Sequence, residues 1–266
     1  MLKTRIITAL CLAAGLLVAL FLLPPPGTAA VFLGIVAIAA WEWAGLLKTR
    51  AGNRKLYAAL TLTLCAALLV AGMPVVLLAT LWSLALVFWL LLVPFWFLRK
   101  WPLKADVLGF LVGWLILLPS WAAMLVLQQR SPRLLLAAMA LVWVADIAAY
   151  FVGRAWGRHK LAPLISPGKT WEGVAGAVIG VEAYGLLLGA ATGALAAPRE
   201  FAFAAMALFL ATIVSIFGDL FESLAKRQAG EKDSSQLLPG HGGVLDRIDS
   251  LTSTLPLVAL VAHLIA

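Results

Sequence analysis

Acidic and basic side chains gather near the C-terminal end of the sequence, between residues 215 and 250. The carboxylates are Asp219, Glu222, Asp233, Asp246 and Asp249, and the cations are Lys226, Arg227, Lys232 and Arg247. Carboxylate oxygens are hard ligands that suit Mg²⁺, which commonly binds through one or two carboxylates together with substrate phosphates. Lysine and arginine neutralise the phosphate oxygens that the metal leaves free. This mixture of side chains predicts a site where Mg²⁺ and phosphorylated molecules meet.

Two pairs of these carboxylates share a spacing of three residues. Asp219 and Glu222 lie at the end of one predicted helix, and Asp246 and Asp249 lie where the next helix begins. Residues three apart project from one face of a helix, so the two helix ends could converge on one or two metal ions. The alternative is a solvated loop in which these acids pair with nearby lysine and arginine, and Asp249 and Ser250 cap the last helix.

A glycine-rich turn separates the two acidic pairs. Pro239 is followed by Gly240, His241, Gly242 and Gly243. Glycine backbone is flexible and leaves its N–H groups free to approach phosphate closely. The turn is therefore expected to help shape the phosphate-binding pocket.

A second polar loop, residues 154–173, contains further phosphate-contacting candidates. Ser166, Lys169 and Thr170 resemble the end of a P-loop, but Leu164 stands where that motif requires glycine. A Walker A motif is therefore excluded, while the three polar residues remain candidates for binding phosphate.

Two carboxylates, Asp146 and Glu182, fall inside apolar segments. Charged groups are costly in a bilayer, so a carboxylate inside a membrane-spanning segment is a candidate functional residue. Asp146 lies near the same membrane face as the acidic pairs and is assigned to the same metal site. Glu182 has no assigned partner, and together the two residues leave an ion-coupled transporter open as an alternative.

The elements that position these residues are expected to be membrane-spanning helices. Hydrophobic residues make up 64% of the 266, charged residues only 12%, and the mean hydropathy is +1.03. Such a chain has too little polar surface for a water-soluble globule. A span needs about 20 largely apolar residues. Nine ranges meet this need, namely 4–23, 28–47, 57–73, 76–97, 107–127, 134–153, 174–197, 202–221 and 251–266. We predict a single all-α, polytopic membrane domain over residues 1–266, with catalytic loops at 154–173 and 222–250.

The distribution of positive charge predicts the orientation of the chain. With nine spans and a cytoplasmic N-terminus, all lysines and arginines except Arg130, Arg133 and Arg199 fall on the cytoplasmic side. Cytoplasmic loops are enriched in these residues, so both polar loops are expected to face the cytoplasm. The net charge of +8 is spread over short interhelical clusters, which argues against a nucleic-acid partner.

The polar segments closely resemble motifs of one enzyme family. Ser223 to Arg227, then Lys232 and Asp233, then Leu238 to Asp249 are similar to the signature of phosphatidate cytidylyltransferases, also called CDP-diacylglycerol synthases. Ser166 to Gly173 looks like a second motif of that family, and Ala40 to Trp43 looks like its early helix. The family's many-span helical architecture also agrees with the hydropathy pattern.

This resemblance implies a reaction, its substrates and its cofactor. CTP and phosphatidic acid would give CDP-diacylglycerol and pyrophosphate, with Mg²⁺ as the cofactor and the bilayer as the source of the lipid. The compartment expected is the bacterial inner membrane, and the sequence leaves a homodimer open.

The site residues then receive separate roles. Asp219 and Asp246 are predicted as the principal metal ligands, with Asp249, Glu222 and Asp146 as further candidates. The phosphate-holding cations are predicted to be Lys226, Arg227, Lys232, Arg247 and Lys169. The residues predicted to shape the substrate pocket are Ser166, Thr170, Ser223, Gly240, His241, Gly242 and Gly243. A CTP-dependent kinase of polyprenol or another lipid alcohol is the alternative reaction, because a related site could transfer the γ-phosphate.

Overall fold

Helices dominate the computed structural model, which describes residues 2–265. Their bounds, in chain order, are α1 Leu2–Phe21, α2 Pro25–Leu46, α3 Ala51–Val70, α4 Val75–Val87, the π-helical turn η1 Phe88–Leu92, α5 Val93–Arg99, α6 Val107–Arg130, α7 Pro132–Trp156, α8 Trp171–Ala191, α9 Pro198–Ala229 and α10 Leu245–Leu264. Two short strands, β1 Lys160–Ala162 and β2 Ser166–Thr170, lie between α7 and α8.

The prediction of a polytopic helical membrane protein is confirmed. Each of the nine predicted ranges contains a helix that covers most of its described residues, although the helix in the range 174–197 ends at Ala191. α4, η1 and α5 join into one continuous segment from Val75 to Arg99. Eight helical segments within residues 2–265 are long and apolar enough to cross a membrane. The ninth, α10, is not one of these eight. It begins with a polar turn, and Leu251 to Leu257 are all buried inside the protein.

The third and fourth ranges are separate helices. Gly72 and Met73 both adopt positive φ angles, 73° and 49°, before Pro74 starts the next helix. Glycine tolerates this conformation, and proline cannot continue the preceding hydrogen-bond ladder. The two helices are therefore separate, as the nine predicted ranges had them.

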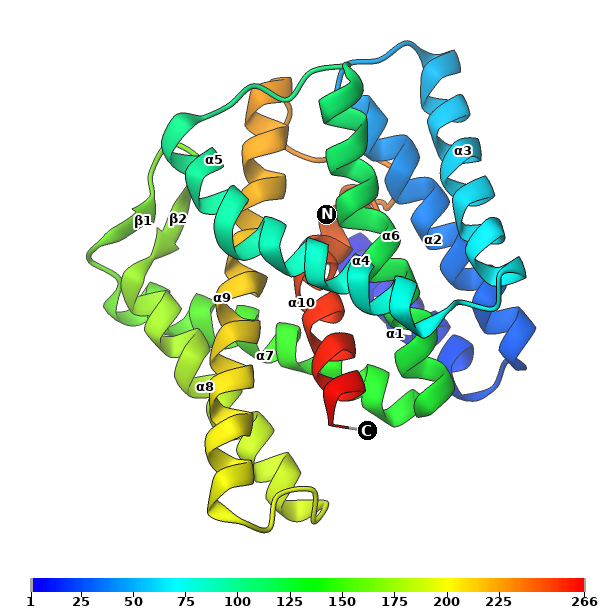
Figure 1. The fold of residues 1–266 in the computed structure, drawn as a ribbon. Coiled ribbons are helices and arrows are strands. Elements are labelled where there is room, and N and C mark those ends of the chain that lie inside the picture. Colours follow the sequence, from blue (N-terminus) through cyan, green and yellow to red (C-terminus); the bar gives the residue numbers. More distant parts are fainter. Residues whose placement is uncertain (1, 266) are drawn as a thin grey trace.

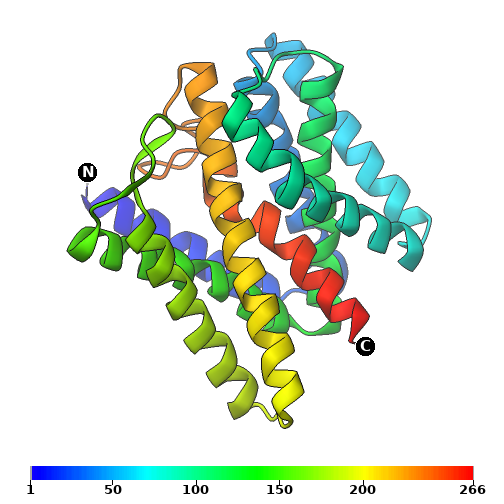
Figure 2. The same cartoon turned by 60° about the vertical axis from the view of Figure 1, so that its left-hand side comes forward.

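The helices surround α10, which lies at the centre of the molecule (Figure 1). α9 packs against both α8 and α10, and the α8 and α9 pair extends beyond the remaining helices at one end (Figure 2). The opposite end of α9 leads into the segment that returns to α10. This connection brings both acidic pairs to one end of the bundle.

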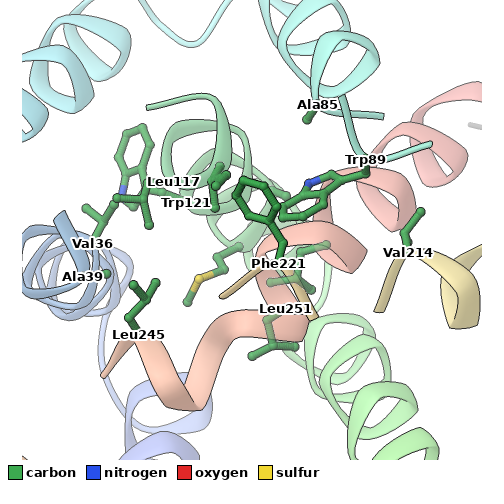
Figure 3. Packing of buried hydrophobic residues seen from close by; sticks show 14 of the residues in the cluster. Val36, Ala39, Ala85, Trp89, Leu117, Trp121, Val214, Phe221, Leu245 and Leu251 are labelled. Atoms are coloured by element: carbon green, nitrogen blue, oxygen red, sulfur yellow. The ribbon is translucent and has the colours of Figure 1, made fainter. Parts of the chain in front are cut away.

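An aromatic cluster fixes the polar end of α9. Phe221 meets Trp89 and Trp96 edge to face, with ring centroids 5.7 and 5.5 Å apart, and stacks on Trp43 at 6.3 Å. Phe221 and Trp89 point toward one another in the core (Figure 3). Such pairs stabilise a core by about 0.5–1.5 kcal/mol beyond their buried area. Residues Asp219 to Glu222 therefore stand on a firmly packed turn.

The loop at 154–173 contains a small antiparallel hairpin that the sequence did not predict. Lys160 pairs with Thr170 and Ala162 pairs with Ser166. The strands are only three and five residues long, and the second contains Pro167 and Gly168, so no alternating pattern reveals them. The hairpin carries Ser166, Lys169 and Thr170 toward α7 and α9.

Candidate active site

A glycine sets the contact between α9 and α10. A Cβ atom on Gly218 would lie 2.7 Å from the carbonyl oxygen of Asp249 and 3.2 Å from Cα of Ser250, closer than such atoms normally approach. The absence of a side chain therefore lets the two backbones come together. As a result Asp219, the next residue on α9, comes within electrostatic range of Asp249 on α10.

Asp146 on α7 completes a group of three carboxylates with Asp219 and Asp249. Each of the three is close enough to another to affect it electrostatically. We call these three residues the open group. Within the described chain no lysine binds Asp146 or Asp249 directly. Asp219 forms an ion pair with Lys169 of β2. The Ser223 hydroxyl also donates to Asp219 Oδ1 at 3.3 Å.

A cavity of about 600 Å³ opens between α7, α8 and α9 beside this group. We call it the α7–α9 cavity. Its charged wall is made by Asp146, Asp219, Lys169 and Arg154, with Ser166 among its polar residues, and most of its remaining lining is apolar. This combination suits a molecule with a charged head and a hydrocarbon body.

The other member of each acidic pair binds Lys226. The Lys226 ammonium lies 2.6 Å from Glu222 Oε2 and 2.6 Å from Asp246 Oδ1. All three side chains are nearly buried, with 12%, 5% and 4% of their surfaces exposed. We call them the bridged group. It ties α9 to α10, and breaking such a buried pair is strongly destabilising.

Asp246 also anchors the segment that precedes α10. Its Oδ2 atom accepts hydrogen bonds from the Ser234 N–H, the Ser234 hydroxyl and the Gly243 N–H, each at 2.8 Å. Both oxygens of Asp246 are thus engaged by the protein itself. The assignment of Asp246 as a principal metal ligand remains a prediction, and the geometry favours the open group for that role.

The aspartates of α10 differ in their electrostatic surroundings, and both precede the apolar part of the helix. Burial raises the pKa of the Asp249 carboxyl above its ordinary value, and the nearby Asp219 carboxylate adds to the rise. Burial acts on Asp246 in the same direction, but hydrogen bonds from Lys226 and the Gly243 N–H outweigh it, so the pKa of Asp246 is lowered. A nearby divalent cation would favour the ionised form of Asp249.

A second cavity, of about 640 Å³, lies over the glycine-rich turn. We call it the loop cavity. Its wall includes the predicted residues Lys232, Arg247, Gly240, His241 and Gly242. The φ angles of 77° at Gly240 and 81° at Gly242 are ones that glycine tolerates and that side chains disfavour.

Arg5 of α1 also lines the loop cavity, and sequence reasoning missed it. Nearby, the Thr8 hydroxyl donates to the carbonyl oxygen of Pro239 at 3.1 Å, which fixes α1 against the turn. In the sequence, Arg5 contributes only to the distribution of positive charge that predicts orientation. Because Arg5 lies more than 200 residues before the glycine-rich turn, no local pattern in the sequence connects the two.

Three predicted residues make contacts other than those expected. The Thr170 hydroxyl accepts the Gly173 N–H at 3.1 Å and so caps α8, although Thr170 also lines the α7–α9 cavity. Arg227 lies on the exposed side of α9, outside both cavities, and donates to the Glu231 carbonyl at 3.3 Å. Gly243 donates its N–H to Asp246.

Glu42 of α2 is the other residue whose contacts the sequence did not reveal. It is 1% exposed and accepts hydrogen bonds from the N–H groups of Val244 and Leu245 and from the Ser235 hydroxyl. The sequence feature that could have identified Glu42 is its position as a single carboxylate within a strongly apolar helix.

The donor chemistry of the open group fits Mg²⁺. Among residues 2–265, no three His, Cys, Asp or Glu side chains already converge as a metal-binding cluster. Mg²⁺ does not need such a cluster, because it commonly takes one or two carboxylates, waters and substrate phosphates. The expectation that acids pair with lysines describes Glu222 and Asp246, which bind Lys226, and Asp219, which binds Lys169. It leaves Asp146 and Asp249 unexplained.

Comparison with known proteins gives one consistent result. Residues 3–265 match the sequence profile of a family described as the cytidylyltransferase family. The chain is 45% identical to a phosphatidate cytidylyltransferase of Pseudomonas aeruginosa, across 97% of this chain and 96% of that protein. It is 36% identical to a protein of the same name from Haemophilus influenzae, across 96% of each. A further protein of that name, from Brucella suis, is 51% identical over 127 residues, or 48% of this chain and 46% of that one.

Proposed function

The chain belongs to the cytidylyltransferase family, and we propose that it transfers the cytidylyl group of CTP to phosphatidic acid, forming CDP-diacylglycerol and pyrophosphate. The family resemblance drawn from the motifs is confirmed, and the chain is an enzyme and an integral, multi-pass membrane protein. One observation carries the proposed reaction. The open group of carboxylates lies beside a largely apolar cavity with a charged wall, at the same end of the bundle as a polar cavity lined by cations.

The proposed metal site uses the open group. Asp219, Asp249 and Asp146 would hold one or two Mg²⁺ ions, which supply positive charge against the phosphate oxygens of both substrates. Support comes from the mutual proximity of the three carboxylates and from the close α9 to α10 contact at Gly218. Glu222 and Asp246 would contribute indirectly, by holding the two helices together through Lys226.

The two cavities suit the two substrates. The α7–α9 cavity would take phosphatidic acid, with Lys169 and Ser166 near its phosphate and the apolar lining near its acyl chains. The loop cavity would take the phosphates of CTP, held by Lys232, Arg247 and Arg5 and by the glycine-rich turn. Arginine and lysine are the usual partners of phosphate oxygens in proteins.

The chemistry requires no general base. A phosphate monoester is already largely ionised near neutral pH, so an oxygen of phosphatidic acid can attack the α-phosphorus of CTP directly. The new P–O bond forms as the bond to the β-phosphate breaks, and pyrophosphate leaves with the negative charge. The obstacle is repulsion between two polyanions, so catalysis rests on positioning and charge neutralisation.

The proposed orientation puts the N-terminus and both polar loops in the cytoplasm, where CTP is available. It is supported by the loop cavity, where Arg5 of α1 lies together with residues of the 230–244 segment. The bacterial relatives are consistent with the inner membrane as the compartment.

The direct test incubates purified protein with labelled CTP, phosphatidic acid and Mg²⁺, followed by lipid extraction. Label in the lipid phase together with pyrophosphate release is expected. Release of CDP with a phosphorylated lipid alcohol would instead support the kinase alternative. Substrate flux in proteoliposomes without turnover of CTP would support a transporter.

A further inference from the structure

A buried carboxylate from α2 caps the first turn of α10. Val244 N–H donates to Glu42 Oε1 at 3.0 Å, and Leu245 N–H donates to Glu42 Oε2 at 2.6 Å. The first N–H groups of a helix have no partner within the helix and need an acceptor. Val244, the residue at the cap position, has an apolar side chain that cannot supply one. Glu42 therefore provides both the acceptors and the negative charge that a helix N-terminus favours.

The same carboxylate holds the segment that forms the loop cavity. The Ser235 hydroxyl donates to Glu42 Oε1 at 2.6 Å, and Ser235 lines that cavity. Gly243 lies tightly between Glu42 and Ser234, and a Cβ atom there would collide with both side chains. Glu42 and Asp246 thus both hold this segment, and the Ser234 hydroxyl lies 3.2 Å from Glu42 Oε2 and 2.8 Å from Asp246 Oδ2.

We propose that Glu42 is a positioning residue for nucleotide binding, an inference that rests on the proposed function. By fixing the start of α10 and the Ser235 region, Glu42 sets the places of Arg247 and the glycine-rich turn in the loop cavity. It does so from a helix far away in sequence, without lining that cavity itself. Its removal should weaken the binding of CTP more than it slows the chemical step.

The substitution Glu42→Gln tests this at constant size. Val244 and Leu245 address different oxygens of Glu42, so the amide group of glutamine would face one N–H donor with another donor. The Michaelis constant for CTP should rise at least about fivefold, as expected for one lost buried hydrogen bond. The Michaelis constant for phosphatidic acid should change less than about twofold, since the α7–α9 cavity does not involve Glu42.

Two further variants make the test specific. Glu182→Gln makes the same chemical change on α8, away from both cavities, and should leave the Michaelis constant for CTP unchanged. Ser235→Ala removes one hydrogen bond to Glu42 and should raise the Michaelis constant for CTP by a smaller factor than Glu42→Gln does. It also carries the test if Glu42→Gln fails to fold.

A second readout needs no catalysis. Hydrogen exchange over residues 234–246, measured without CTP or Mg²⁺, should be at least about tenfold faster in Glu42→Gln than in wild type or Glu182→Gln. If Glu42→Gln lowers only the amount of active enzyme, and leaves the Michaelis constant for CTP and the hydrogen exchange of residues 234–246 unchanged, the positioning role is overturned. Failure of the wild type to convert CTP and phosphatidic acid would instead overturn the proposed function, and the exchange result would still decide the role of Glu42.

Discussion

The two acidic pairs have the same spacing but different partners. In each pair one carboxylate, Glu222 or Asp246, is buried against Lys226, while the other, Asp219 or Asp249, belongs to the open group. The bridged group joins α9 to α10, and two members of the open group, Asp146 and Asp219, line the α7–α9 cavity. Spacing alone identifies which residues share a helix face, but the partner across the interface decides whether a carboxylate stabilises the fold or remains available to a ligand.

The largest expected effect is on the bridged group. Lys226→Met leaves the buried carboxylates of Glu222 and Asp246 facing each other without their cation. We expect the unfolding free energy to fall by about 3–5 kcal/mol. Thermal unfolding in detergent measures this, with Lys55→Met at an exposed position as the control. Equal stability of the two variants would show that the bridge contributes little.

Next in size is a substitution in the open group. Asp219→Asn keeps the shape of the side chain but removes its charge, and cytidylyl transfer should fall about 10²–10³-fold. Stability should change far less than in Lys226→Met, because Asp219 is partly exposed. Initial rates with labelled CTP test this, and Glu231→Gln, an exposed acid nearby, should remain within about twofold of wild type. Full activity of Asp219→Asn would remove Asp219 from the site.

A smaller effect is expected where the two groups meet. Gly218→Ala inserts a Cβ atom 2.7 Å from the Asp249 carbonyl oxygen and forces α9 and α10 apart. The shift should lower activity about tenfold, through displacement of Asp219 from Asp249. Gly34→Ala, where the added Cβ meets no atom within 4 Å, is the matched control. Equal rates for the two variants would mean that the close approach is not needed.

The smallest expected effect concerns the segment attached to the bridged group. Ser234→Ala removes one hydroxyl hydrogen bond to Asp246 but leaves the backbone N–H bond in place. Activity should fall by about fivefold or less, because Asp246 keeps its bonds to Lys226 and to the N–H groups of Ser234 and Gly243. Ser83→Ala on the exposed side of α4 serves as the control, and a loss as large as that of Asp219→Asn would place Ser234 in direct contact with substrate.

The sequence predicted the features that depend on local pattern. Hydropathy located the helical segments, the boundary at Gly72 to Pro74 included, and Asp146 was correctly assigned to the neighbourhood of Asp219. The spacing of the acidic pairs correctly indicated that Asp219 and Glu222 lie on one helix and Asp246 and Asp249 on the next. These predictions succeeded because periodicity and apolar length are properties of short segments.

Features that depend on how helices rotate against each other were not predictable. Lys226 pairs with Glu222 and Asp246 rather than with Asp219 and Asp249. This pairing depends on how α9 and α10 pack at Gly218. The contacts of Glu42 with Leu245 and of α1 with the glycine-rich turn join residues about 200 positions apart. No local signal carries such pairings.

The most direct test of the account measures divalent-cation binding rather than turnover. Mn²⁺ binding to the detergent-solubilised protein can be followed by electron paramagnetic resonance in the presence of CTP, for wild type, Asp219→Asn and Glu222→Gln. We expect at least about tenfold weaker Mn²⁺ binding for Asp219→Asn and an affinity within about threefold of wild type for Glu222→Gln. Wild-type affinity in Asp219→Asn, or an equal loss in both variants, would contradict the division between the open and the bridged carboxylates.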